Sequence, residues 1–357
     1  MPVKIYEEDG CVLRHKKELA QLGRRALIVT GRHSAKLNGS LDDVQEALSS
    51  EGVFWTLFDE VEENPSVETV MKARDAGLRA QADFVIGIGG GSAMDAAKAV
   101  ALMMFHSEQD KSYLYTKGAD SSAVPVAVVP TTCGTGSEAT AVSVLTRPDM
   151  GVKGSIPHKI FPALALSDPG YLAFAPKTVI GNTAVDAFAH LAESYINTNA
   201  TDYSRMCVRE GLRIWSRSKD VLLGKRQAGP EDYRNLMNAS TMAGMAICHT
   251  GTSLPHGLSY PLTCEFGIPH GRAVGFFLSG YLRQSFAEDQ SAVLGTAGFS
   301  DVDEFEEFYY AVCGRLEIEE EKLLLMADAM MENQAKLKNC PYAVDRDVMR
   351  KIAVSCR

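Results

Sequence analysis

The sequence predicts a protein of two domains, with a doubly wound parallel α/β sheet in residues 1–165 and an all-α domain in residues 166–357. In the first part, short apolar runs alternate with helical patterns, which indicates parallel strands joined by crossover helices. Strand signals stop near residue 165, and the remaining chain is helical in pattern. A chain of 357 residues is long enough for each domain to bury a core of its own.

Four strands are predicted in the first domain. Each is a short apolar run that leads into a polar or glycine-rich loop, as buried parallel strands do. The runs span residues 26–30, 53–58, 84–88 and 124–129. Helical patterns follow at 42–48 and after residues 63–66, where Pro65 is expected near the first turn. Ligands of such sheets bind at the carboxyl ends of the strands, so this domain is predicted to be of the nucleotide-binding type.

The second domain reads as a series of helices. A Pro-Gly turn in residues 167–170 marks the predicted boundary between the α/β pattern and the helical pattern. The helical patterns cover residues 177–195, 202–219, 231–249, 254–263 and 271–286, followed by acidic amphipathic segments from Asp301 to the end. No internal repeat is evident.

Charge and composition restrict the partners. The formal net charge is −9, which disfavours nucleic acid and anionic membranes, since both require a basic surface. No stretch approaches the roughly 20 apolar residues of a membrane span, and the N-terminus lacks the apolar segment of a signal peptide. The eight cysteines are scattered without a CxxC pair, which favours reduced thiols. We therefore expect a cytoplasmic protein that binds neither nucleic acid nor membrane.

A glycine-rich loop after the third strand is a candidate phosphate site. Residues 89–92 read Gly-Gly-Gly-Ser and precede a helical pattern. Gly90 and Gly91 allow close approach of a ligand to the backbone, and Ser92 with Asp95 has the spacing of a capping box. The start of the helix would then bind an anion. The alternative is an ordinary turn, and the loop departs from the standard dinucleotide fingerprint because serine replaces its third glycine.

A second polar loop follows the fourth strand. Residues 130–138 contain four hydroxyl side chains and two glycines. Such a loop could bind the end of a dinucleotide that lies away from the glycine-rich loop. Lys153 is a candidate for a charge near the phosphate or ribose, although a single lysine is more often solvated surface.

A metal site is predicted in the helical domain. Asp186 and His190 are four residues apart on an alanine-rich helix, so both side chains leave the same face. His256 and His270 each lie between proline and glycine, and together the four residues offer a ligand set for a divalent metal. The alternative, from spacing alone, is a surface ion pair with two structural histidines. With the metal candidates in one domain and the glycine loops in the other, we expect the site in a cleft between them.

The motifs occur in the order of a known family. Gly-Gly-Gly-Ser with Asp95, Pro-Thr-Thr-x-Gly-Thr-Gly-Ser-Glu at 130–138, Asp-Ala-x-x-His-x-x-Glu at 186–193 and two later His-Gly pairs resemble the iron-containing (group III) alcohol dehydrogenases. The resemblance runs from about residue 26 to 280, with a weaker match at 339–341.

The resemblance implies an α/β domain that binds NAD(P), an all-α metal-binding domain and a homodimer. It implies metal ligands at Asp186, His190, His256 and His270. It implies cofactor contacts at Asn64, Gly90, Gly91, Ser92, Thr131, Thr132, Thr135 and Lys153. Gly31 and Asp95 are also predicted to bind the cofactor, from their places after the first strand and in the glycine-rich loop.

The sequence departs from the family pattern at three places. Gly31 follows Thr30 where the family often has an aspartate that binds ribose, and Arg32 and Lys36 come soon after, so we expect NADP to be preferred over NAD. Tyr260 stands where some members have a further histidine, and its role is left open. Cys133 stands where alanine is commoner, which hints at sensitivity to thiol reagents.

The predicted reaction moves hydride between the nicotinamide and a small primary alcohol or aldehyde. Fe²⁺ or Zn²⁺ suits three imidazoles and a carboxylate, and would polarise the substrate oxygen. A glycerol or polyol dehydrogenase and a dehydroquinate-synthase-like lyase remain alternatives on the same fold. A metal- or nucleotide-binding sensor is the non-enzymatic alternative.

Overall fold

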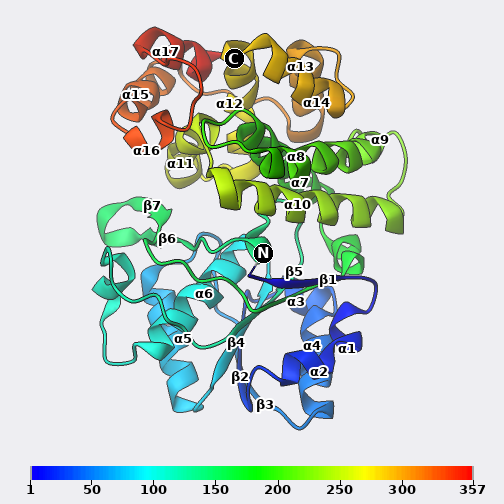
Figure 1. Ribbon diagram of the computed structural model, residues 1–357, viewed down its shortest axis with the longest axis vertical. Coiled ribbons are helices and arrows are strands. Elements are labelled where there is room, and N and C mark those ends of the chain that lie inside the picture. Colours follow the sequence, from blue (N-terminus) through cyan, green and yellow to red (C-terminus); the bar gives the residue numbers. More distant parts are fainter. Residues whose placement is uncertain (1, 356–357) are drawn as a thin grey trace. The chain divides into compact units, whose positions relative to one another are not determined.

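The computed structural model describes residues 2–355 and divides into two compact units (Figure 1). The first unit comprises Met1–Thr132 and Ser137–Ala175. The second comprises Pro176–Arg357 and a short piece of the preceding loop, Cys133–Gly136. The first is an α/β unit and the second is helical, so the predicted fold class is confirmed.

The first unit contains a six-stranded parallel sheet with the order β1-β8-β5-β4-β2-β3. Its strands are β1 (Lys4–Glu7), β2 (Arg25–Thr30), β3 (Phe54–Phe58), β4 (Phe84–Gly89), β5 (Val126–Pro130) and β8 (Leu164–Ser167). The four predicted strands are present. The prediction missed β1 and β8, because each has only four residues and β1 is polar, as suits an edge strand.

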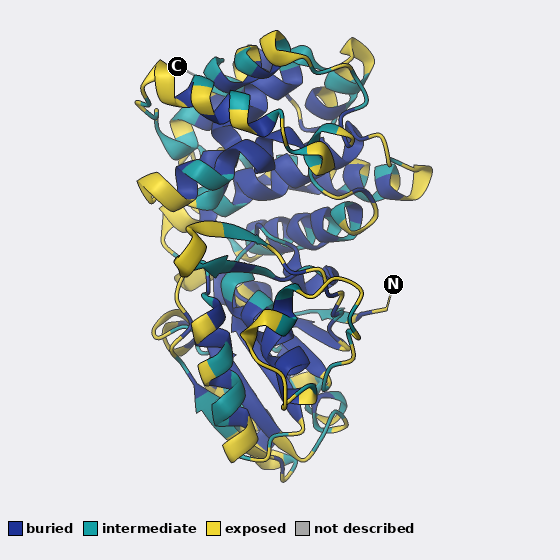
Figure 2. Cartoon of the chain, turned by 90° about the vertical axis from the view of Figure 1, so that its left-hand side faces the viewer, coloured by how far each residue is buried: buried dark blue, intermediate teal, exposed yellow. Residues whose placement is uncertain are grey.

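Helices cover both faces of this sheet. Alternate strand residues point to opposite faces, so Val29 and Val128 join one core while Ile28 and Val129 join the other. The first core also takes in α5 (Val67–Arg79) and α6 (Gly91–Phe105). The second takes in α1 (Cys11–Arg14), α2 (Lys16–Ala20), α3 (Ser34–Leu37) and α4 (Ser40–Ser50). Figure 2 shows the buried strands between helices with exposed outer faces.

Helix α5 begins later than expected. Its N-cap is Ser66, whose hydroxyl accepts a hydrogen bond from the Thr69 backbone, so Pro65 precedes the helix and does not lie in its first turn. The backbone of Asn64 explains the shift, because its φ of 58° is outside the helical region.

A small antiparallel hairpin joins the α/β unit between β5 and β8 and was not predicted. It consists of β6 (Val144–Arg147) and β7 (Val152–Ser155), joined by the 3₁₀ turn η3 (Pro148–Met150). The Thr146 backbone donates a hydrogen bond to Pro65 O, which ties the hairpin to the start of α5. Further 3₁₀ turns in this unit are η1 (Lys111–Tyr115), η2 (Ser137–Ala139) and η4 (Pro169–Phe174).

The second unit is built around α7 (Lys177–Tyr195). This helix packs against several others, and from Ala184 onward all its residues are buried. The surrounding helices are α8 (Asp202–Trp215), α9 (Lys219–Leu222), α10 (Pro230–Thr250), α11 (Leu254–Phe266), α12 (His270–Gln284), α13 (Ala287–Thr296), α14 (Val302–Cys313), α15 (Glu320–Met330), α16 (Gln334–Leu337) and α17 (Arg346–Val354), with the turn η5 (Ser216–Ser218). All helices predicted for this unit are present, although the one predicted for 202–219 ends at Trp215, and the prediction missed α9 and α13.

No disulfide occurs among residues 2–355, where seven cysteines have free thiols, as predicted. The eighth, Cys356, lies outside the described residues. Every described helix is too short or too polar to cross a bilayer.

An aromatic cluster anchors α7 to its neighbours. The Phe188 ring stacks on Phe305 at 4.8 Å between centroids and lies 5.0 Å from Trp215. The indole of Trp215 donates a hydrogen bond to Ala184 O at 2.8 Å. From the sequence, Phe188, Leu254, Phe266 and Phe277 could line a pocket or pack in the core. Phe188, Leu254 and Phe277 are fully buried, and Phe266 is 37% exposed.

We expect Phe188→Ala to lower the unfolding free energy of the helical unit by about 3–5 kcal/mol, because it leaves a cavity in a closed cluster. Calorimetry of the whole chain would measure this as a lower melting temperature of that unit. Tyr203→Ala on α8 is the control, since Tyr203 is 76% exposed. Equal melting temperatures for the two variants would contradict the assigned role of Phe188.

Candidate functional site: a metal centre and two cofactor loops

Helix α7 places two of the predicted ligands on one buried face. Asp186 and His190 are 2% and 6% exposed, with Asp186 Oδ2 4.0 Å from His190 Nδ1. His190 Nδ1 also lies 3.2 Å from the carbonyl oxygen of Gly134. Because a carbonyl only accepts, Nδ1 must carry the proton, which leaves Nε2 of His190 unprotonated and available to a metal.

The third predicted ligand, His256, lies in the first turn of α11. Its Nδ1 donates to the buried carboxylate of Glu193 at 2.5 Å, which directs Nε2 toward Asp186 Oδ1 at 3.5 Å. Glu193 also accepts a hydrogen bond from the Ser253 backbone. In the sequence, Glu193 was recognised only as the end of the 186–193 motif, without a predicted role. Its position seven residues after Asp186, on the same helical face, was the available signal.

The fourth predicted ligand, His270, begins α12. Its Nε2 lies 3.9 Å from Asp186 Oδ1, and its side chain is 25% exposed. Gly271 makes this approach possible, because a Cβ there would lie 1.9 Å from Asn182 O and 3.0 Å from Asp186 Cβ. The glycine therefore lets the start of α12 pack against α7 at the site.

The donor atoms fit a divalent cation. Ligand atoms of Asp186, His190 and His256 all lie within 4.8 Å of one another. Tetrahedral coordination at about 2.1 Å separates ligand atoms by about 3.4 Å, close to the separations of Asp186 Oδ1 from His256 and His270. Asp186 Oδ1 and His256 Nε2 are buried and have no hydrogen-bond partner within residues 2–355. Buried polar atoms without partners are costly, and a shared cation would satisfy both.

The electrostatics of this cluster favour a cation. Burial opposes the ionisation of Asp186, but the attraction of the three histidines outweighs it and holds the pKa of the carboxyl below its usual range. Burial lowers the pKa of His190 to about 4. Burial also acts against protonated His256, but Glu193 and Asp186 outweigh it and raise its pKa to about 9. Two carboxylates thus concentrate negative charge at the ligand atoms.

The glycine-rich loop joins β4 to α6, as predicted, but its capping differs. Gly90 is the N-cap and Gly91 the first helical residue, so Ser92 lies within the first turn and forms no capping box with Asp95. The Asp95 carboxylate instead accepts from the Ser137 hydroxyl at 2.6 Å and from the Val144 backbone at 2.9 Å. Local spacing suggested a cap, but these tertiary hydrogen bonds engage Asp95.

Asn64 connects the glycine-rich loop to the hairpin. Its backbone N–H donates to Ser92 Oγ at 3.2 Å, and its carbonyl accepts from Thr146 Oγ1 at 3.0 Å. Its side-chain Oδ1 accepts from Lys153 Nζ at 2.5 Å. The structure therefore brings together Asn64, Ser92 and Lys153, three residues that are far apart in the sequence.

The second polar loop divides between the two units. Thr131 donates from its backbone to Gly89 O at 3.0 Å, and a Cβ at Gly90 would lie 3.0 Å from Thr132 Oγ1, so both threonines adjoin the glycine-rich loop. Thr135 belongs to Cys133–Gly136, the piece that packs with the helical unit. Within one unit the structure does not bring Thr135 to the other predicted cofactor contacts.

The piece Cys133–Gly136 fits closely into the helical unit. A Cβ at Gly134 would lie 2.8 Å from Thr183 O, and one at Gly136 would lie 2.5 Å from the Gly244 backbone. Cys133 is buried with its Sγ 3.3 Å from Thr183 Oγ1, and burial raises the pKa of its thiol to about 11. The suggestion of thiol sensitivity is therefore wrong, since reactivity requires an accessible thiolate.

A charged group surrounds the carboxyl ends of β2 and β3, where Gly31 is half-buried and Arg32 exposed. Lys36 Nζ lies 2.6 Å from Asp59 Oδ2, and this hydrogen bond, with a smaller contribution from Arg32, lowers the pKa of Asp59. Asp59 was not among the residues predicted from the sequence. Asp59 directly follows β3, and its position after a strand could have identified it.

Known proteins are similar to this chain over both units. The family model described as "Iron-containing alcohol dehydrogenase" matches residues 2–169, and "Fe-containing alcohol dehydrogenase family, C-terminal" matches residues 180–304. "Long-chain-alcohol dehydrogenase 1" of Geobacillus thermodenitrificans (strain NG80-2) is 32% identical over 292 residues, covering 79% of this chain and 72% of that protein. The chain belongs to the iron-containing alcohol dehydrogenase family.

Solved structures of this family share its fold. The iron-containing alcohol dehydrogenase of Thermotoga maritima superposes with a TM-score of 0.90 at 34% identity, covering 100% of this chain and 98% of that chain. The sulfoacetaldehyde reductase of Bifidobacterium kashiwanohense, solved in complex with NAD⁺, gives 0.88 at 25% identity, covering 99% of this chain and 97% of that one.

Membership makes the chain an oxidoreductase of the alcohol dehydrogenase type, with a divalent metal and a nicotinamide dinucleotide as cofactors. It favours this activity over the lyase and the sensor that the sequence left open.

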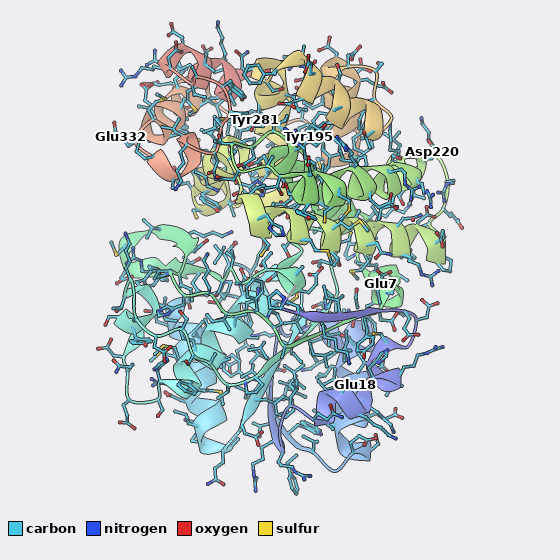
Figure 3. The ribbon with its side chains drawn as sticks, viewed as in Figure 1. Glu7, Glu18, Tyr195, Asp220, Tyr281 and Glu332 are labelled. Atoms are coloured by element: carbon cyan, nitrogen blue, oxygen red, sulfur yellow. The ribbon has the colours of Figure 1, made fainter. Side chains whose placement is uncertain are left out.

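The role of Glu193 in this iron-containing alcohol dehydrogenase can be tested by Glu193→Gln. We expect metal affinity to fall about 10–100-fold, because the amide no longer provides the charge that orients His256. Zinc titration of the metal-free protein measures this directly. Glu332→Gln, at the surface in Figure 3, is the control. Unchanged zinc affinity in Glu193→Gln would show that the carboxylate does not support the ligand.

Proposed function

We propose that this chain transfers hydride between NADP(H) and a small primary alcohol or aldehyde, at a metal held by Asp186, His190, His256 and His270. The observation that carries the proposal is a pair of buried atoms, Asp186 Oδ1 and His256 Nε2, which lie 3.5 Å apart. Neither atom has a hydrogen-bond partner among residues 2–355. The proposal assigns dinucleotide binding to residues 1–165 and metal and substrate binding to residues 166–357.

The protein engages one ring nitrogen of each of two ligands. Nδ1 of His190 donates to Gly134 O and Nδ1 of His256 donates to Glu193, which leaves Nε2 of each ring as the atom that would bind a metal. When bound, the cation would polarise the substrate oxygen and the nicotinamide would accept or donate the hydride. Burial of Asp186, His190 and His256 keeps water away from the ligand atoms.

The loops of the α/β unit would bind the cofactor. The backbone at Gly90, Gly91 and Ser92 starts α6 and offers N–H groups to a phosphate. Thr131 and Thr132 adjoin this loop, and Lys153 provides a positive charge beside Asn64. Asp95 holds the loop to the 137–144 segment, so we assign it a supporting role. Thr135 remains a proposed contact on the resemblance alone.

A metal-removal experiment tests the main proposal. NADPH oxidation is measured with aldehydes of increasing chain length, before chelation, after chelation and after Fe²⁺ or Zn²⁺ is added back. Asp186→Ala and His270→Ala should lose the metal and nearly all turnover, because each removes a ligand, while NADPH affinity is retained. Substantial turnover by a variant that contains no metal would contradict the proposal.

We propose NADP(H) over NAD(H) from the charges near Gly31. Arg32 and Lys36 provide two positive charges, and Asp59 compensates only one of them. A 2′-phosphate would neutralise the remaining charge. The NAD⁺ complex of the sulfoacetaldehyde reductase shows that a related protein binds the other cofactor, so the preference needs a direct test.

We expect Arg32→Ala to lower kcat/KM for NADPH by about tenfold or more, the value of a hydrogen bond to a charged group, and to affect NADH much less. Lys72→Ala, on α5, is a matched control that removes one positive charge elsewhere. A wild-type preference for NADH, or equal losses with both cofactors, would refute the assignment.

The oligomeric state and compartment are also part of the proposal. We propose a cytoplasmic homodimer. The outer edge of β1 has no strand partner within residues 2–355, which leaves one side of the sheet open to a second copy. The free thiols support a reducing compartment.

A further inference from the structure

Lys336 places an ammonium group inside the helical unit, close to α11. It belongs to α16, which follows the turn that carries Glu332 in Figure 3. Its Nζ donates a hydrogen bond to Thr252 Oγ1. Its stem packs over Gly257, the residue after His256, because a Cβ at Gly257 would lie 3.2 Å from Lys336 Cγ. The side chain is therefore fixed and directed toward the segment that carries a metal ligand.

This ammonium has no counter-ion of its own. No carboxylate oxygen lies within 4.0 Å of Nζ in residues 2–355. Burial lowers the pKa of Lys336 to about 8, and the attraction of Glu193 offsets this only in part. Glu193 is itself engaged, with the Ser253 backbone and His256 as its partners. A charge removed from water without a partner is unfavourable, so the local environment favours an additional anion.

Tyr260 connects this charge to the metal centre. Lys336 Nζ lies 5.8 Å from the centre of the Tyr260 ring, within the range of a cation–π contact. The same ring stacks on His270 with 6.1 Å between centroids and an angle of 14°. Thr252, Tyr260 and Lys336 are all half-buried, so part of each residue is exposed to solvent. Because both contacts share the Tyr260 ring, the sum of the two distances, 11.9 Å, is an upper limit for the separation of Nζ from the centre of the His270 ring.

We propose that Lys336 binds a carboxylate at the far end of the substrate, so that the preferred substrates are short aldehydes or alcohols that carry a terminal carboxylate. This specificity rests on the proposed function, since it requires the substrate oxygen at the metal centre. Thr252 orients the ammonium, and Tyr260 forms the wall between the carboxylate and His270.

A purely structural role predicts different behaviour. If Lys336 only compensates the charge of Glu193, its removal should weaken metal binding and affect charged and uncharged ligands alike. If it binds a carboxylate, its removal should affect ligands with a second negative charge selectively. The difference between two matched ligands therefore distinguishes the roles.

The test uses the full-length, zinc-loaded protein and calorimetric titration with succinate and with butanoate. These have the same chain length, and only succinate has a second carboxylate. The wild type should bind succinate at least about tenfold tighter, the value of a hydrogen bond between charged groups. Lys336→Met, which keeps an unbranched stem over Gly257, should bind the two within about threefold of each other. Lys336→Arg should restore part of the preference.

Lys338→Met is the control, because Lys338 is exposed one residue beyond α16. It should keep the wild-type preference. Zinc content and melting temperature are measured for every variant. Equal preference in the wild type and Lys336→Met would overturn the inference, as would equal loss of both ligands with loss of zinc.

A kinetic arm separates this inference from the proposed function. Succinate semialdehyde should be reduced with a kcat/KM about tenfold above that of butanal in the wild type, and Lys336→Met should lose that ratio. Reduction of both aldehydes without any difference between them would overturn the inference and leave the proposed function standing. Selective binding of succinate without any aldehyde reduction would support Lys336 as a carboxylate site and count against the proposed function.

Discussion

The metal centre depends on a carboxylate held deep in the helical core. Asp186 is 2% exposed on a helix whose neighbours are alanine, valine and phenylalanine, and one of its oxygens lacks a hydrogen-bond partner within residues 2–355. A charge in that position is tolerated only when other groups compensate it. Histidines from α7, α11 and α12 surround it, and the unsatisfied atoms that remain are those a divalent cation would use.

Close backbone packing is the structural condition for this arrangement. Gly271 allows α12 to approach Asn182, and Gly136 packs against Gly244 on α10. Each of these contacts leaves no space for a side chain. The short piece Cys133–Gly136 belongs to the helical unit for the same reason, and its carbonyl at Gly134 sets the protonated nitrogen of His190. Gly271 on α12 and Gly134 in this piece therefore both lie against α7, the helix that carries two ligands.

In the α/β unit, one residue in a strained backbone conformation holds the candidate cofactor loop in place through several hydrogen bonds. Asn64 has a φ of 58°, which is uncommon outside glycine, and its backbone and side chain bond to Ser92, Thr146 and Lys153. Such a conformation persists when its surroundings determine it, and it is frequent at binding sites. Here it connects the start of α6 to the hairpin, so the phosphate loop and its nearby lysine are held as one unit.

The sequence by itself determined the fold class, four of the six strands of the parallel sheet, the main helices and the metal-ligand candidates. These follow from hydrophobic periodicity and from residue types at fixed spacing on one helix, which are local properties of the chain. Asp186 and His190 could be paired because one turn of α7 separates them. His256 and His270 were joined to this pair because each lies between proline and glycine, and the order of motifs in a known family then implied the same four ligands.

Only the tertiary structure decided which side chains serve the site and which hold the fold. Asp95 appeared to be a capping residue, but the distant Ser137 and Val144 engage it. Cys133 lay in a polar loop, but burial made it an unreactive thiol. Glu193, Asp59 and Lys336 gained their roles from partners 63, 23 and 84 positions away along the chain. Hydrogen bonds between distant segments, and the burial of the side chains that make them, depend on how helices and strands pack. A local sequence pattern does not determine that packing.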